Sequence, residues 1–273
     1  MKKILTINEI HGINLELIKS FDEFCKKHNL KYYICYGTLL GAVRHKGFIP
    51  WDDDADLAMT RDEYERMITI YQKESSLNDR YVLSYSGNGH MHGGYAKWMD
   101  THIALKRKYM FKGIDDSFLG IDIFPFDKVP CNSKTRKQIL RKANLCRYLF
   151  DVSSLKLHNL FLNSIVQILL FPFHLIPLDV YDRWQNQIVK NASLKVHDEN
   201  YVYMQITWNF SGINEIITKE DVRSNPEVIT FEGEELPVFK SYKDFLKGTY
   251  GDYMTLPKES KRRTHDMYAE YIE

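Results

Sequence analysis

The sequence predicts a mixed α/β (α+β) protein in which helices cover a mixed sheet and a largely helical region is added to it. Residues 7–29 carry apolar side chains at helical spacing. Short aromatic and β-branched runs, such as residues 31–36 and 118–125, are typical of buried strands. From Lys128 onward a basic stretch leads into an apolar one, which indicates further helices.

The first elements follow from hydrophobic periodicity. A helix over residues 7–29 is predicted to cover one face of the sheet with the apolar residues Ile10, Ile13, Leu17, Phe21 and Phe24. Residues 31–36 form a strand that is followed by a turn at Gly37, and a second helix begins at about Thr38. A glycine and a hydroxyl residue therefore stand where a helix begins.

Acidic residues mark two of the following strands. Residues 54–59 alternate acidic and apolar side chains, so a strand there sends Asp54 and Asp56 to the same face. A later apolar strand contains one acid, Asp122, and is expected to end at Pro125. The other elements predicted before residue 130 are a helix at 61–74, a strand at 81–85 and, at 87–94, a glycine-rich loop of the kind that closes over ligands.

Composition narrows the class of protein. The 273 residues carry a formal net charge of +1, which gives no general field for binding nucleic acid. The four cysteines show no C-x-x-C spacing, and a chain of this length does not need disulfides, so we expect reduced thiols in the cytoplasm. Asn8, Glu9 and His11 interrupt any apolar signal-peptide core near the N-terminus.

Four carboxylates occupy five consecutive positions: Asp52, Asp53, Asp54 and Asp56. Carboxylates this close repel one another, and a hard divalent cation with oxygen ligands is the simplest compensation. We therefore predict a Mg²⁺ or Mn²⁺ site, against the alternative of a solvated acidic loop or a helix N-cap. Asp52 and Asp53 could also lie outside the ligand set.

A phosphate-transfer site is the simplest way to combine these features. Asp54, Asp56 and Asp122 would hold one or two ions, while the turn at Gly37 and Thr38 donates backbone N–H groups and a hydroxyl to phosphate oxygens. Neither part alone would be persuasive. Together they predict metal-assisted transfer of a phosphate group.

The region after residue 130 carries no chemical motif. No acid occurs from Lys128 to Phe150, and residues 157–178 are apolar but too interrupted for a membrane span, so they predict either an interfacial or a core helix. The basic residues of this stretch are Lys134, Arg136, Lys137, Arg141, Lys142 and Arg147. The predicted organisation is a catalytic core at 1–130, a mostly helical acceptor- or membrane-facing region at 131–230, and a C-terminal segment at 231–273 that returns to the core.

Several segments resemble the LicD family. They run in order along most of the chain: residues 37–45, 47–56 and 120–125, then Tyr250-Gly251-Asp252-Tyr253-Met254 and Leu256-Pro257. The resemblance implies a nucleotidyltransferase-like fold related to DNA polymerase β. Members transfer phosphocholine from CDP-choline to glycans such as teichoic acid or lipopolysaccharide, and relatives such as fukutin-related protein transfer ribitol phosphate from CDP-ribitol.

The resemblance also implies roles for individual residues. Asp54 and Asp56 match the metal-binding pair, Asp122 matches the third carboxylate of the wider superfamily, and Gly37 and Thr38 match the phosphate-binding turn. The expected mechanism is in-line attack of an acceptor hydroxyl on the phosphorus that bears choline, with CMP leaving. Asp122 is the candidate general base, with a purely structural acid as its alternative.

Candidate contacts to the diphosphate or the nucleotide are Arg44, His45, Lys97 and His265. Arg44 is the strongest, because a guanidinium binds phosphate oxygens in a bidentate manner and this one lies between the turn and the acids. For Lys97 a surface charge is an equal alternative, and an isolated histidine is more often structural. The cationic run Lys258, Lys261, Arg262 and Arg263 is interpreted as a solvated face.

The predicted function is metal-dependent transfer of phosphocholine from CDP-choline to a glycan precursor, with a peripheral membrane contact through residues 134–178 and no nucleic-acid partner. Transfer of another phospho-alditol is the nearest alternative. Because Asp54-Ala55-Asp56 is also a D-x-D, a nucleotide-sugar glycosyltransferase is a second one. A non-catalytic module braced by an ion is a third.

Overall fold

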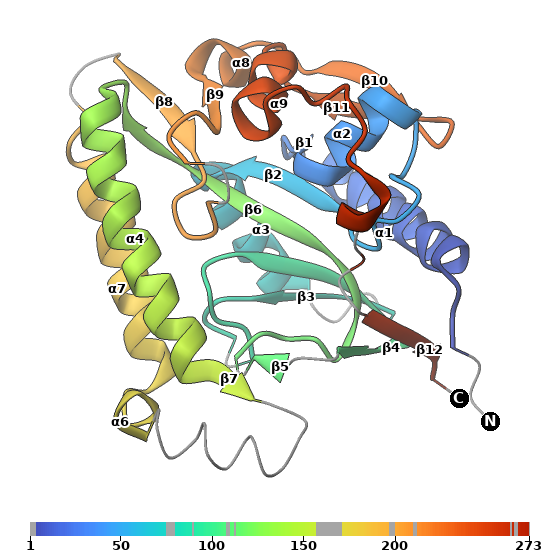
Figure 1. Ribbon diagram of the computed structural model, residues 1–273, viewed down its shortest axis with the longest axis horizontal. Helices are drawn as coiled ribbons and strands as arrows, with labels where there is room; N and C mark the ends of the chain where they lie inside the picture. Colours follow the sequence, from blue (N-terminus) through green and yellow to red (C-terminus); the bar gives the residue numbers. More distant parts are fainter. Residues whose placement is uncertain are drawn as a thin grey trace.

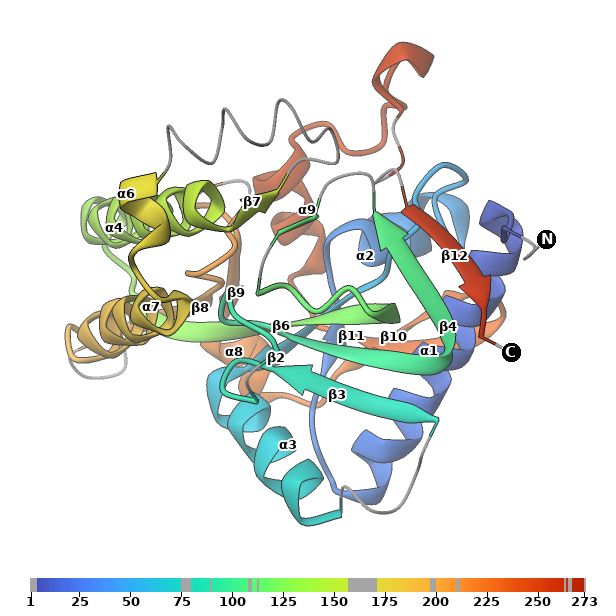
Figure 2. The same cartoon turned by 90° about the horizontal axis from the view of Figure 1, so that it is seen from below.

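The computed structural model describes residues 4–74, 80–88, 90–107, 110–111, 113–156, 171–196, 200–209, 212–262, 264 and 267–272. One mixed sheet forms its centre, and Figure 2 shows α1 and α3 on one side of this sheet. The helices are α1 (Ile7–Lys27), α2 (Tyr36–His45), α3 (Arg61–Glu74), α4 (Ser133–Ser154), α6 (Phe171–His174), α7 (Leu178–Ser193), α8 (Lys219–Arg223), α9 (Tyr242–Tyr250) and the 3₁₀ turn η1 (Glu259–Lys261).

The sheet runs in the order β1-β2-β6-β4-β12, with β3 on β4, β8 on β6 and β9 on β8. Its strands are β1 (Tyr33–Ile34), β2 (Asp56–Thr60), β3 (Tyr81–Tyr85), β4 (Ala96–Arg107), β6 (Phe118–Pro130), β8 (Tyr201–Met204), β9 (Ile216–Thr218) and β12 (Met267–Tyr271). Two small ladders stand apart from it: β5 (Met110–Phe111) with β7 (Leu155–Lys156), and β10 (Glu227–Phe231) with β11 (Glu234–Val238).

The pairing makes the sheet mixed, as predicted. β2 and β6 are parallel, whereas β6 with β4 and β4 with β12 are antiparallel. The parallel pair places Asp56 beside Asp122 in register. The mixed α/β class is therefore confirmed, while the finer relation to DNA polymerase β stays a prediction.

Helix α1 confirms the predicted amphipathic element. Its N-terminus has a capping box, in which the Thr6 side chain and the Glu9 carboxylate each satisfy the other's backbone N–H group. Its apolar face packs on the sheet through fully buried residues such as Leu17 and Phe21. The helix ends at Lys27, two residues earlier than expected.

Two predicted strand boundaries are wrong. β2 begins at Asp56, so Asp54 lies in the preceding loop rather than on the same strand face. The strand around Asp122 continues through Pro125 to Pro130. Pro125 pairs with Met59 on one side, and the neighbour on the other side, β4, is in register only as far as Ile123, so no ladder hydrogen bond is lost at the proline.

Helices α4 and α7 form a layer at one end of the sheet (Figure 1). They pack on β6 and β8 through a separate apolar cluster that includes Val129, Ile139, Leu140 and Val202. Strands β8 and β9 lie within the region predicted to be mostly helical. C-terminal β12 pairs with β4, so this segment lies on the main sheet. The domain boundaries themselves stay a prediction.

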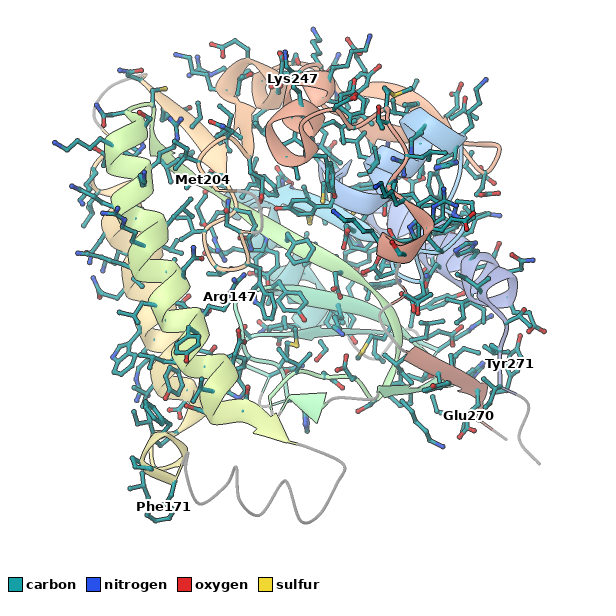
Figure 3. The ribbon with its side chains drawn as sticks, in the orientation of Figure 1. Arg147, Phe171, Met204, Lys247, Glu270 and Tyr271 are labelled. Atoms are coloured by element: carbon teal, nitrogen blue, oxygen red, sulfur yellow. The ribbon has the colours of Figure 1, made fainter. Side chains whose placement is uncertain are left out.

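The predicted basic surface on α4 is smaller than the sequence indicates. Arg136 is buried, and its Nη1 donates to the carbonyls of Pro130 (3.4 Å) and Cys131 (2.5 Å). Figure 3 shows Arg147 between α4 and the sheet, where its guanidinium lies 5.8 Å from the ring centre of Trp208. The exposed cations of this helix are Lys134, Lys137, Arg141 and Lys142.

Most of the apolar segment 157–178 lies outside the described residues, so its predicted helix is not described. At its end, Phe171 and Leu175 are 59% and 65% exposed (Figure 3). In the part of the chain that the structure describes, no helix is long and apolar enough to cross a membrane.

Candidate active site

Helix α2 begins at Tyr36, two residues before the predicted start at about Thr38, and the backbone of its first residue is unusual. Tyr36 has φ +43°, a left-handed value that costs about 1 kcal/mol or more for a residue with a side chain. The Tyr36 hydroxyl donates to the carboxylate of Glu215, and both residues are buried. This contact ties the start of α2 to a segment far along the chain and holds the turn in its conformation.

Gly37 and Thr38 form hydrogen bonds to the acidic strand, and their predicted contact to phosphate oxygens stays a prediction. The Gly37 N–H donates to Asp56 Oδ2 (3.4 Å), and the Thr38 hydroxyl accepts the Asp56 N–H (2.8 Å). A Cβ added at Gly37 would stand 2.7 Å from Asp52 Oδ2. Only glycine lets this carboxylate approach the start of α2, which gives Asp52 a place in the site that sequence reasoning left open.

Asp56 is the electrostatic centre of the acidic cluster. Burial raises its pKa well above the ordinary range, and the carboxylates of Asp54, Asp122 and Asp52 raise it further. The Asp122 N–H donates to the Ala55 carbonyl (2.9 Å), which fixes the two strands in register. The structure thus brings together the three acids that were predicted as catalytic and metal-binding residues.

Helix α1 supports this loop through two residues that sequence reasoning missed. His11 Nε2 lies 2.6 Å from the Asp52 carbonyl oxygen, and its ring stacks on Phe48. Asn14 Nδ2 donates to the Asp53 carbonyl (3.1 Å). Asn14 is fully buried, and Asp53 is only 3% exposed. The sequence did contain a signal for this support, because the polar residue Asn14 lies on the apolar face of the predicted helix.

Lys97 lies beside the third carboxylate, in register with Asp122 across β4 and β6. Its side chain is only 3% exposed, so it is not a surface charge. Its Nζ forms an ion pair with Asp116 Oδ1 at 2.6 Å and lies 3.9 Å from Asp122 Oδ1. The ammonium therefore faces the acidic cluster, and a direct contact to the nucleotide stays a prediction.

Arg44 and His45 lie at the other end of α2. Arg44 Nε donates to His45 Nε2 (3.0 Å), and Nη1 donates to the Tyr253 carbonyl (3.2 Å). Burial, followed by the charge of Arg44, lowers the pKa of His45. His265 lies outside the described residues, so its predicted contact remains a prediction.

Tyr250 links this end of α2 to the acids. The residue is partly exposed, but burial of its hydroxyl and the nearby Asp56 carboxylate raise its pKa well above the ordinary range. The same phenol raises the pKa of Arg44. The C-terminal segment with the matched residues 250–254 therefore borders the site.

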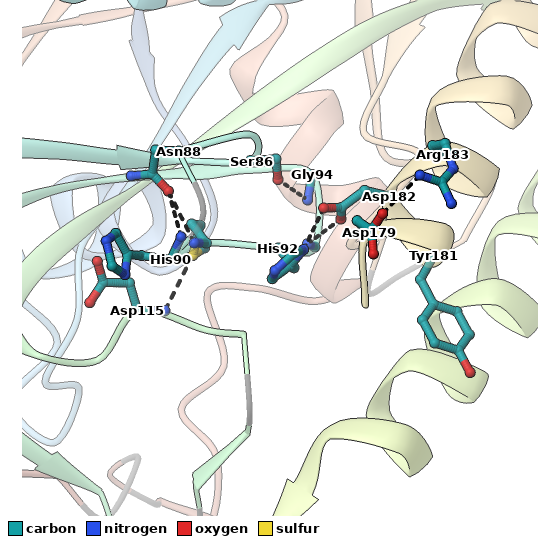
Figure 4. Close-up of polar contacts among 12 residues, drawn as sticks. Ser86, Asn88, His90, His92, Gly94, Asp115, Asp179, Tyr181, Asp182 and Arg183 are labelled. Atoms are coloured by element: carbon teal, nitrogen blue, oxygen red, sulfur yellow. Dashed lines mark hydrogen bonds and ion pairs between the residues drawn. The ribbon is translucent and has the colours of Figure 1, made fainter. Parts of the chain in front are cut away.

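The glycine-rich loop at 87–94 is fastened to the helical layer (Figure 4). His92 Nδ1 lies 2.5 Å from Asp182 Oδ2, and the Gly93 N–H donates to Asp182 Oδ1 (3.2 Å). On the other side of the loop, the Gly94 N–H donates to the Ser86 hydroxyl (2.9 Å). These contacts hold the described part of the loop to α7 and to Ser86, the residue that follows β3, and its predicted closure over a ligand stays a prediction.

The divalent metal ion stays a prediction. Within the described residues, no group of three or more His, Cys, Asp or Glu side chains is arranged to hold a metal ion. Yet the raised pKa of Asp56 shows that several carboxylates share one partly buried space. Oxygen donors with excess negative charge suit Mg²⁺ or Mn²⁺, so the site fits the ion in chemistry and charge without forming a closed coordination shell.

A comparison with known protein families assigns part of this mixed α/β chain to the nucleotidyltransferase class. Residues 29–163 match the family described as LicD/FKTN/FKRP, nucleotidyltransferase domain. These residues include the turn, Asp54, Asp56, Asp122 and Lys97. Residues 29–163 are thus identified as a domain of this family, which confirms the resemblance found in the sequence.

Individual proteins with similar sequences cover different shares of this chain. The lipopolysaccharide cholinephosphotransferase LicD of Haemophilus influenzae is 26% identical over 273 residues, which cover all of both chains. An uncharacterized protein of Rickettsia prowazekii is 32% identical over 124 residues, which are 41% of this chain and 44% of the relative. An uncharacterized protein of Rickettsia typhi is 47% identical over 58 residues, 21% of this chain and 19% of the relative.

Proposed function

We propose that this chain transfers phosphocholine from CDP-choline to a hydroxyl of a cell-surface glycan precursor and releases CMP. The observation that carries the proposal is the register of Asp56 and Asp122 on parallel strands, with Asp54 and the Gly37 turn beside them. The full-length similarity to a lipopolysaccharide cholinephosphotransferase supports the choice of donor and the general class of acceptor. Family membership argues against the D-x-D glycosyltransferase alternative.

Asp54, Asp56 and Asp122 would hold the divalent ion. When bound, such an ion neutralises diphosphate charge and lowers the pKa of the attacking hydroxyl. The hydrogen bonds from Gly37 and to Thr38 fix Asp56, so its carboxylate does not have to reorganise when the donor binds. Tight positioning of this kind supplies much of the catalysis in phosphoryl transfer.

The acceptor proton needs a base within hydrogen-bond reach. The Asp122 side chain is 20% exposed, which leaves it able to receive a proton from an acceptor hydroxyl. Lys97 Nζ lies 3.9 Å from Asp122 Oδ1 and is held there by its ion pair with Asp116. We assign the role of general base to Asp122 and a positioning role to Lys97.

A choline head group needs exposed aromatic faces to bind its quaternary ammonium group. Tyr95 and Trp98 are each 5% exposed and belong to the core, and the Trp98 indole N–H donates to Ser20 Oγ. Neither can face a quaternary ammonium group from the solvent side. Other phospho-alditols therefore stay as the alternative donor class.

The exposed surface of the helical layer supports a membrane-bound acceptor. Four cations of α4 are exposed, and with them Leu145, Tyr148, Phe171 and Leu175 are at least 55% exposed. Basic side chains beside apolar ones suit an anionic lipid surface. We propose peripheral contact with the inner face of the membrane, from the cytoplasm. Weaker sedimentation of Arg141→Glu than of wild type with anionic vesicles, but not with neutral ones, would support it.

The decisive experiment measures product release by the purified chain. It is incubated with CDP-choline, CDP-ribitol, CDP-ethanolamine or UDP-sugars, with a glycan extract, in magnesium or in chelator. The variants are Asp54→Ala and, as a matched control, Asp62→Ala, whose side chain is 71% exposed and pairs with Lys128. We expect magnesium-dependent CMP release from CDP-choline that is lost only in Asp54→Ala.

Other outcomes identify the alternatives. CMP released from CDP-ribitol alone would make the chain a phospho-alditol transferase of different donor specificity. UDP released from a nucleotide sugar would overturn the proposal in favour of a glycosyltransferase. No turnover, with lower stability of Asp54→Ala in magnesium, would indicate a binding module braced by an ion.

A further inference from the structure

Two guanidinium groups share one indole beside the acidic cluster. The Cζ atom of Arg262 lies 4.6 Å from the ring centre of Trp51, and that of Arg44 lies 6.0 Å from it. Arg44 comes from the last turn of α2, and Arg262 follows η1 near the C-terminus. The sequence interpretation of Arg262 as part of a solvated face is therefore incomplete, because its side chain is only 29% exposed.

Neutral groups hold these two cations in place. Arg44 Nη1 donates to the Tyr253 carbonyl (3.2 Å), and Arg262 Nε donates to the Pro257 carbonyl (3.1 Å). Among the described residues, no carboxylate pairs with Arg44. The acid that pairs with Arg262 is Glu259, at 3.8 Å, and the Glu259 side chain is 90% exposed. Such an exposed pair contributes little.

Two guanidinium groups held near each other by neutral groups indicate a binding site for an anion. Burial and the positive charge of Arg262 both lower the pKa of Arg44, so the pair is electrostatically unfavourable by itself. An anion between the two guanidinium groups would remove that repulsion and accept charge-assisted hydrogen bonds from both. Planar guanidinium groups suit phosphate oxygens particularly well.

The position of the two guanidinium groups beside the acidic cluster indicates which kind of anion they bind. Trp51 directly precedes Asp52, whose carboxylate lies against Gly37. The Tyr250 phenol is close enough to affect Arg44 and is itself affected by Asp56 and Asp52. A ligand that spans from a divalent ion held by the carboxylates to the guanidinium groups thus needs negative charge at two adjacent centres, which a diphosphate has.

We infer that Arg44, Arg262 and Trp51 form a diphosphate subsite, in which Arg262 binds the phosphate that leaves with the nucleotide. The inference rests on the proposed function for the identity of the donor, but the subsite itself is defined by the two cations and the indole. Charge builds up on the leaving phosphate during transfer, so Arg262 would contribute more to the transition state than to the ground state.

The test uses inorganic pyrophosphate as the probe, so it does not depend on turnover. Calorimetry in magnesium compares the wild-type chain with Arg262→Gln, Arg262→Lys and Lys261→Gln. Lys261 is the matched control, because it carries the same charge at the adjacent position and its side chain is exposed. We expect at least a tenfold loss of pyrophosphate affinity in Arg262→Gln, a partial loss in Arg262→Lys and less than a twofold change in Lys261→Gln.

Results contrary to the inference are equally clear. Equal pyrophosphate affinity in wild type and Arg262→Gln would overturn it, as would equal losses in Arg262→Gln and Lys261→Gln, which would show a general charge effect. Circular dichroism checks that each variant is folded, and Trp51→Phe provides a second test of the same subsite if Arg262→Gln is not. If no CDP-alcohol is turned over but pyrophosphate binding still needs Arg262, the proposed donor fails while the subsite stands.

Discussion

The acids at the two ends of the parallel pair β2–β6 have neighbours of opposite charge. At one end, Asp127 is only 2% exposed, and Arg61 binds its carboxylate through Nε at 2.7 Å and Nη2 at 3.1 Å. At the other end, the charged groups that most affect Asp56 are three further carboxylates. The ion pair of Arg61 with Asp127 stabilises the fold, whereas the carboxylates around Asp56 still need a cation to neutralise them. The contrast separates a structural acid from a functional one on the same two strands.

The largest expected effect tests the functional end. Asp56→Asn should lower turnover by about 10³-fold or more, because it removes a ligand from the site that orients the donor. In chelator the same variant should be more stable than wild type, because one of four repelling charges is gone. Initial rates of CMP release and thermal unfolding in chelator measure the two effects. A loss of stability together with normal turnover would contradict the assignment.

The structural end should behave in the reverse manner. Arg61→Ala leaves the Asp127 carboxylate buried without its partner, which should cost about 3–5 kcal/mol of the free energy of unfolding. The KM for the donor should not change in the fraction that remains folded. Urea denaturation and donor titration provide the measurements. If Arg61→Ala impaired donor binding without loss of stability, the two ends would not be distinct.

An effect of intermediate size is expected when two glycines are replaced by alanine and compared. Gly37→Ala would place a Cβ 2.7 Å from Asp52 Oδ2, so we expect turnover to fall about tenfold to a hundredfold. Gly12→Ala in α1 meets nothing within 4 Å and should stabilise the protein by about 0.5–1 kcal/mol. Steady-state kinetics measure the turnover of both variants, and thermal unfolding measures their stability. Unchanged turnover in Gly37→Ala would show that the Asp52 approach is unimportant.

The smallest effect is the pH dependence of stability in chelator. The pKa of Asp56 is higher in the folded than in the unfolded chain, so the folded state binds this proton more tightly. Its stabilising contribution is present below the unfolded pKa and is lost as pH rises through the raised folded pKa. The unfolding midpoint of the wild type should therefore fall by about 2–4 °C relative to Asp56→Asn as pH rises. Parallel pH profiles would contradict this.

Local patterns in the sequence were sufficient for several elements. The capped, periodic α1 and the helix at 61–74 formed where expected, and the acids at 54, 56 and 122 gather at one site. The two helices depend on residues close together in the chain, whereas the grouping of Asp122 with Asp54 and Asp56 was predicted from the matched family motifs. The strand at 81–85 was also predicted correctly from neighbouring residues.

Features that depend on distant contacts could not be predicted. Whether Arg136 is buried or Arg262 lies on an indole depends on which segment folds against it, and charge alone suggests solvent for both. Strands β8 and β9 are short, and the pairing of β8 with β6 and of β9 with β8 is set by packing rather than by local pattern. The start of β2 at Asp56 likewise follows from its ladder with β6 and not from the alternation at 54–59.

The register of Asp56 with Asp122 also has a kinetic consequence. Helix α3 and strands β3 and β4 separate these residues along the chain, so their pairing closes a long loop and belongs to the slow, non-local part of folding. Helical content should therefore recover early during refolding, while catalytic competence appears only when this pair of strands has joined. A partly folded chain of this kind would contain most of its helices and no assembled reaction centre.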